Sequence, residues 1–203
     1  MHNLCIRFEP TDMSDTTSTL TAEQVIAATR EWVDRAVIGL NLCPFAKAVQ
    51  VKNQIRYAVS HAVEPDALRL ELVDELRLLA KADPAAHDTT LLIHPQVLTD
   101  FLDYNDFLDV ADGVVDELGL TGQIQIASFH PHYQFAGSAP DDIENFTNRS
   151  PFPILHLLRE ASVERAVSAF PDTDRIYENN MESLRRLGHQ GWQRLFDALE
   201  KKR

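Results

Sequence analysis

Strand-like and helix-like segments alternate through the middle of the chain, and this alternation limits the fold more than any other feature. Runs rich in β-branched and aromatic residues at 51–61, 89–94 and 123–129 are typical of strands. Amphipathic stretches at 65–82 and 97–118 separate them, with apolar residues at every third or fourth position. This order predicts βαβαβ units, and therefore an α/β fold with a small, mostly parallel three-stranded sheet flanked by helices. A ferredoxin-like α+β arrangement is the alternative, because the strands are few.

Further helices are expected on both sides of this core. Thr21 and Gln24 form the pattern of a capping box, which predicts a helix that runs to Gly39. Helices are also predicted at 154–170 and 176–201, the second interrupted near Gly188 and Gly191. Residues 1–20 are polar and predict a flexible leader, and residues 21–203 predict a single α/β domain with a helical C-terminal part.

Charge and composition narrow the classes of function. The chain has 31 Asp and Glu residues against 19 Lys and Arg residues, a net charge of −12. A nucleic-acid partner is not expected, because such proteins present a basic surface. No apolar run reaches the length of a membrane-spanning helix, so no membrane partner is expected either. Two cysteines and no signal-peptide pattern predict a soluble, cytoplasmic protein, with a homo-oligomer compatible with its acidic surface and helical ends.

Each predicted strand ends in a histidine, at His61, His94 and His130. The carboxyl ends of parallel strands meet at one edge of a sheet, so we expect these side chains to lie close together. His130 and His132 are candidate catalytic acid–base groups, because imidazole titrates near neutral pH. Their spacing also fits two ligands of a divalent metal such as zinc, with Asp141 as a third. The alternative is that these histidines hydrogen-bond to the backbone of a loop.

Cys43 is the third candidate catalytic residue. It precedes Pro44, and proline is favoured at the first position of a helix. As the N-cap of such a helix, Cys43 would have a lowered thiol pKa and would favour the nucleophilic thiolate. The alternative is an inert buried cysteine.

Residues 130–152 show neither a helix nor a strand pattern, and long loops of this kind often form binding sites. Ser150 is a good N-cap for the helix predicted to follow, and its free N–H groups with Arg149 would bind a carboxylate or phosphate. We therefore predict four substrate-binding residues, Tyr133, Asn148, Arg149 and Ser150. The alternative is that Ser150 only caps a helix while Arg149 pairs with an acidic group.

Three motifs together resemble an uncharacterised family of unknown function found mainly in proteobacteria. They are LNLCPFA at 40–46, SFHPHYQF at 128–135 and TNRSPFPILHLLRE at 147–160. The resemblance covers about residues 21–192 and implies no activity and no catalytic residue.

The residues therefore predict an enzyme that acts on a small polar or anionic metabolite through a histidine-rich site at the strand ends. A non-catalytic domain that binds a ligand or another protein is the alternative.

Overall fold

The structure is a computed structural model that describes residues 20–168 and 174–196. The predicted leader lies almost entirely outside the described residues. The capping box is confirmed: Thr21 caps α1 (Ala22–Trp32), its side chain accepts from the Gln24 N–H, and the Gln24 side chain accepts from the Thr21 N–H. The helix continues as a π-helical turn, η1 (Val33–Ile38), and a short helix, α2 (Ala46–Val51), follows.

The predicted alternation of strands and helices is confirmed along the chain. It appears as β1 (Ile55–Val59), α3 (Pro65–Lys81), β2 (Thr89–Ile93), α4 (Phe101–Glu117) and β3 (Ile124–Phe129). The first strand is shorter than predicted, because residues 46–51 extend the preceding helical layer. A 3₁₀ turn, η2 (Ile143–Thr147), lies in the long loop after β3.

A fourth strand corrects the predicted three-stranded sheet. β4 (Ile154–Arg159) lies between β2 and β3, and the sheet order is β1-β2-β4-β3. β1 and β2 are parallel, whereas β4 is antiparallel to both of its neighbours. The sheet is therefore mixed, and it is not ferredoxin-like, because the strands of the first βαβ unit are direct neighbours.

The helix predicted over 154–170 is wrong in its first part. β4 takes residues 154–159, and only the rest forms a helix, α5 (Glu160–Ser168). A short apolar run fits a buried strand or a buried helix equally well by periodicity. Here the run is apolar on both faces because β4 is a central strand with helices above and below it.

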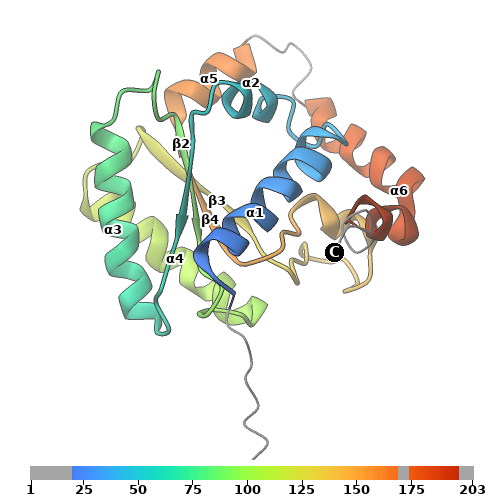
Figure 1. Cartoon of the computed structure of the whole chain (residues 1–203), viewed down its shortest axis with the longest axis horizontal. Helices are drawn as coiled ribbons and strands as arrows, with labels where there is room; N and C mark the ends of the chain where they lie inside the picture. The colour runs from blue at the N-terminus through green and yellow to red at the C-terminus, as the bar shows by residue number, and fades with distance from the viewer. Residues whose placement is uncertain (1–19, 169–173, 197–203) are drawn as a thin grey trace, which may run out of the picture.

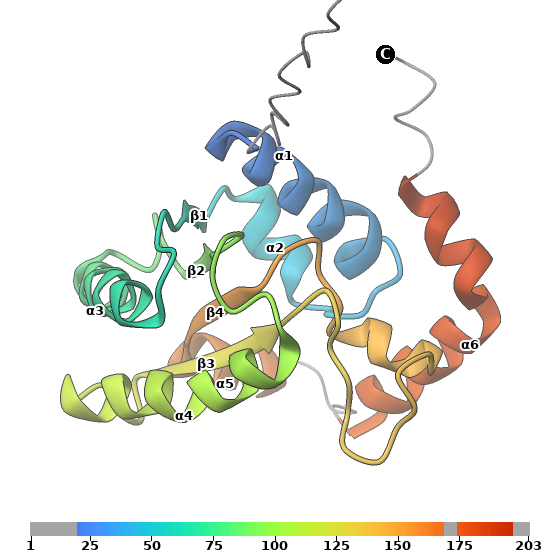
Figure 2. The same cartoon turned by 90° about the horizontal axis from the view of Figure 1, so that it is seen from below.

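Two layers of helices cover the sheet, one on each face (Figures 1 and 2). Leu92, Leu155 and Leu157 point into a core shared with α3 and α4. Leu91 and Ile154 point the other way, into a second core with α1 and η1. Because side chains of a strand alternate between faces, His156 shares the second face with Ile154.

The C-terminal helix α6 (Asp174–Phe196) packs beside the long loop, away from α3 (Figure 2). Gly188 breaks it as predicted, with a positive φ of 62° that L side chains rarely adopt. Within residues 20–168 and 174–196, no helix is both long and apolar enough to span a membrane.

Candidate functional site

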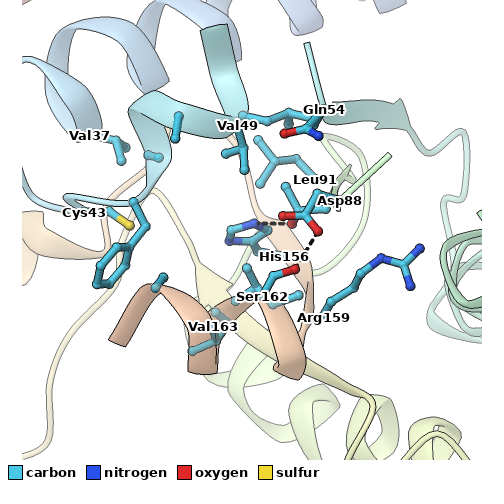
Figure 3. Close-up of a pocket in the computed structure, with 18 of the residues that line it drawn as sticks. Val37, Cys43, Val49, Gln54, Asp88, Leu91, His156, Arg159, Ser162 and Val163 are labelled. Carbon is cyan, nitrogen blue, oxygen red and sulfur yellow. Dashed lines mark hydrogen bonds between the residues drawn. The ribbon is translucent and has the colours of Figure 1, made fainter. Parts of the chain in front are cut away.

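A cavity of about 760 Å³ lies over the second face of the sheet. Its walls come from η1, α2 and α5, and its floor is formed by β2, β4 and β3 (Figure 3). Most of the lining is apolar, with Val37, Leu91, Ala127, Phe129 and Val163 among it. A volume of this size and an apolar lining with a few polar groups are typical of small-molecule sites.

His156 is the polar side chain at the centre of this floor. It lies on β4 in register with Leu91 of β2 on one side and with Ala127 of β3 on the other. Ala127 is small, so the ring borders open space on that side, and the centroid of the Phe129 ring lies 6.0 Å from that of the imidazole. In Figure 3 the imidazole lies between α2 and α5, in the middle of the cavity.

The hydrogen bonds of Thr89 fix the tautomer of His156. The Thr89 hydroxyl lies 2.6 Å from the Leu157 carbonyl oxygen, to which it donates its only proton. The same hydroxyl oxygen lies 2.7 Å from Nε2 of His156 and must therefore accept from an Nε2–H group. Nδ1 of His156 consequently carries a free lone pair. Nδ1 has no partner among the described residues and is accessible from the cavity.

Burial keeps the His156 ring neutral. The imidazole lies in the floor of the cavity, and desolvation by burial lowers its pKa from 6.5 to about 4. Among the residues that the structure describes, no carboxylate pairs with the ring to offset the cost. At neutral pH the cavity floor therefore presents a hydrogen-bond acceptor without charge.

Cys43 lines the same cavity. In Figure 3 its sulfur points into the cavity, in the direction in which His156 lies. The predicted helix start at Pro44 is wrong, because α2 begins at Ala46 with Phe45 as its N-cap. Burial raises the pKa of the Cys43 thiol, and backbone N–H groups of Phe45 and Ala46 offset this only in part. The lowered pKa that we predicted is thus also wrong, and Cys43 is a protonated thiol at neutral pH.

Polar and charged groups mark the rim of the cavity. Ser162 of α5 donates a hydrogen bond of 2.6 Å to Asp88 and closes one end. Arg159 turns its guanidinium away from the cavity (Figure 3), toward the carbonyl oxygens of Leu79 and Ala82 at the end of α3. Lys52 and Arg165 are exposed. Asp88, which is half-buried, is therefore the carboxylate of the described cavity lining, and it is engaged by Ser162.

Two of the predicted strand-end histidines meet, but outside this cavity. His94 and His130 both pack on Tyr104, with ring centroids 5.7 Å and 5.0 Å from it. This follows from topology, because β2 and β3 are both antiparallel to β4 and end at the same edge. His61 follows the edge strand β1 and is exposed.

Both ring nitrogens of His130 form hydrogen bonds with backbone groups. Nε2 lies 3.2 Å from the Leu98 carbonyl oxygen, and Nδ1 accepts from the His132 N–H at 3.0 Å. Burial of its ring lowers the pKa of His130. His132 and Asp141 are exposed, and among the described residues no group of three or more His, Cys, Asp or Glu could hold a metal ion. The zinc site stays a prediction for which these residues supply no ligand group.

The four predicted substrate-binding residues lie in or beside the long loop and outside the cavity lining. Arg149 donates to the carbonyl oxygens of Tyr133 and Pro140, and its guanidinium lies 4.4 Å from the Phe146 ring centroid. Asn148 donates to the Ser128 carbonyl oxygen at 3.1 Å.

Ser150 does not cap a helix, because a strand follows it. Its hydroxyl donates to the Phe152 carbonyl oxygen at 2.6 Å. The helix N-terminus that would have bound an anion does not exist, so this part of the prediction is wrong.

A comparison with models of protein families gives a match for this chain. The model of a family described as a protein of unknown function (DUF1415) matches residues 24–194. The chain belongs to the DUF1415 family. The match runs from α1 to α6, so it contains the whole sheet and every residue of the cavity lining. No curated protein and no solved structure matches the chain.

Membership of DUF1415 confirms the resemblance seen in the sequence, but the central site residue escaped the sequence analysis. His156 and Thr89 were not predicted as site residues. The sequence does show a polar histidine within the apolar run 154–158. This histidine points to a site only if the run is known to be a strand, because the strand turns it toward the cavity. Cys43 is the one predicted catalytic residue that lines the cavity, and His156 is the imidazole that shares it.

Proposed function

We propose that this protein binds a small, mainly apolar organic molecule in the cavity over β2, β4 and β3. One observation carries the proposal. A space of about 760 Å³ with an apolar lining contains the free Nδ1 of His156 at its centre. Sites that take small molecules combine an apolar wall with one or a few polar groups that fix orientation.

The expected polar or anionic metabolite fits this cavity less well than an apolar one. The cations Lys52 and Arg165 lie at the exposed rim, and the floor offers a lone pair that repels an anion. Arg149, which was to bind the anion, is engaged within the loop. This supports the ligand-binding alternative. The enzyme stays a prediction, and a thiol-dependent reaction would depend on Cys43 and His156, which line the same cavity.

Filling the cavity tests the proposal. Nile red, a neutral apolar dye, should fluoresce more strongly with the wild-type protein. Ala127→Trp on the floor and Val37→Trp on the wall should each remove most of this enhancement, because a large ring occupies the space. Ala161→Trp is the matched control, since Ala161 is exposed on α5 and does not line the cavity.

Circular dichroism and thermal unfolding identify the variants that keep the fold. Unchanged dye binding in a folded Ala127→Trp or Val37→Trp protein would overturn the proposal. Two filling positions on different elements make it improbable that both variants fail to fold for the same reason.

A further inference from the structure

At the centre of its floor, the cavity offers a ligand a polar contact that no described residue satisfies. Nδ1 of His156 is that contact. Nε1 of Trp32 and Nε of Arg159 also lack a partner among the described residues, but both are buried within the wall.

Other polar side chains of the lining are exposed, as Lys52 and Gln125 are, or already take part in hydrogen bonds. Gln54 donates to the carbonyl oxygens of Pro84 and Ala85. Asp88 accepts from Ser162. The contact left for a ligand at the centre of the floor is therefore an acceptor in mainly apolar surroundings, with the Asp88 carboxylate at the end that Ser162 closes.

A lone acceptor in an apolar site selects for ligands that donate. A hydroxyl or a ring N–H would satisfy Nδ1, whereas an ether of the same shape would leave Nδ1 desolvated and unpaired. A carboxylate would set its own lone pairs against Nδ1. An ammonium group would donate, but Asp88 already accepts from Ser162, and the apolar lining around Nδ1 would not compensate the ammonium group's loss of water.

We infer that the ligand of this cavity is a neutral, mainly apolar compound that donates a hydrogen bond from a hydroxyl or ring N–H to Nδ1 of His156. The inference rests on the proposed function and goes beyond it by naming the chemical class. Because Thr89 holds Nε2 at 2.7 Å, the acceptor is oriented before the ligand arrives.

Three matched probes test the inference: 2-naphthol, 2-methoxynaphthalene and naphthalene-2-carboxylate, titrated by calorimetry at pH 7. The wild-type protein should bind 2-naphthol about tenfold more tightly than the methyl ether, as one hydrogen bond in an apolar site allows. The carboxylate should bind most weakly. In His156→Leu the ratio between naphthol and ether should fall to about one, with binding of the ether retained. His94→Leu is the control, because His94 is buried outside the cavity and the ratio should stay about ten.

The outcomes of these titrations separate a failure of the inference from a failure of the proposed function. Equal affinity for naphthol and ether, or tightest binding of the carboxylate, would overturn the inference and leave the proposed function standing. The same holds if Nile red binds but none of the three naphthalenes does. A tenfold preference that survives in His156→Leu would also overturn it, because another group would then be the acceptor. If neither Nile red nor any naphthalene binds, the proposed function itself is wrong.

Discussion

The neutral state of buried histidines predicts a specific loss of stability on acidification. Burial lowers the pKa of His156 from 6.5 to about 4, and the pKa of His94 falls by a similar amount for the same reason. Between these values the unfolded chain binds a proton that the folded chain does not. The contribution of these neutral rings to the free energy of unfolding therefore has its full value above pH 6.5 and decreases as the pH falls toward 4.

The magnitude follows from the two pKa values. One pKa unit corresponds to about 1.4 kcal/mol, so complete titration of one such histidine costs about 3 kcal/mol. Between pH 7 and pH 5 the linkage relation gives about 2 kcal/mol for each ring. Replacing His156 by Leu should therefore leave a protein that loses about 2 kcal/mol less than the wild type over this interval. Thr89 still donates to the Leu157 carbonyl oxygen in this variant, so no buried donor is left unpaired.

Urea unfolding at pH 7 and pH 5, followed by circular dichroism, measures the difference. Titrating groups common to both proteins cancel in the comparison, provided that the dependence on urea concentration has the same slope. His61→Leu removes an exposed imidazole and serves as the control. An equal loss of stability in wild type and His156→Leu would refute the reasoning, because His156 could not then be neutral in the fold.

Two further predictions concern the thiol and the long loop. In a Cys5→Ser background, alkylation of Cys43 by iodoacetamide should follow a pH profile whose midpoint lies above that of a free thiol, because burial raises its pKa; a midpoint at or below the free value would contradict this. Asn145→Ala should lower the free energy of unfolding by about 3 kcal/mol, because the buried amide bonds the Phe135 N–H, the Ser138 hydroxyl and two carbonyl oxygens. Ser138→Ala, which removes one hydroxyl, should cost about 1 kcal/mol in the same urea titration, and equal losses would contradict the central role of Asn145.

The helical layers of this fold were predictable from local signals. The capping box at Thr21, the leucine stripe of α3 and the glycine at 188 each act within a few residues of sequence. The three strands predicted from β-rich runs also appear, since each is short and bounded by polar or turn residues.

The fourth strand could not be predicted in the same way, because what makes residues 154–159 a strand is the pair of open edges between β2 and β3. A short apolar run takes its conformation from such tertiary pairing rather than from its own periodicity. The site was missed for the same reason. On a helix His156 would have lain one turn from Arg159, whereas on β4 it faces the cavity and the Arg159 guanidinium reaches the end of α3.

The position of His156 gives an independent reason to regard the cavity as a functional site. A central strand between two helical layers is the place where an apolar side chain stabilises a fold most, and the residues on either side of His156 are Leu155 and Leu157, both fully buried. An imidazole there forfeits part of that stabilisation and leaves one nitrogen unsatisfied, with Ala127 keeping the adjoining space open. Proteins depart from the local rules of packing in this way mainly where function requires it. If the floor is open for a ligand, as we propose, His156→Leu should raise the free energy of unfolding at pH 7 while weakening the binding of donor ligands, and a loss of stability in this variant would contradict the argument.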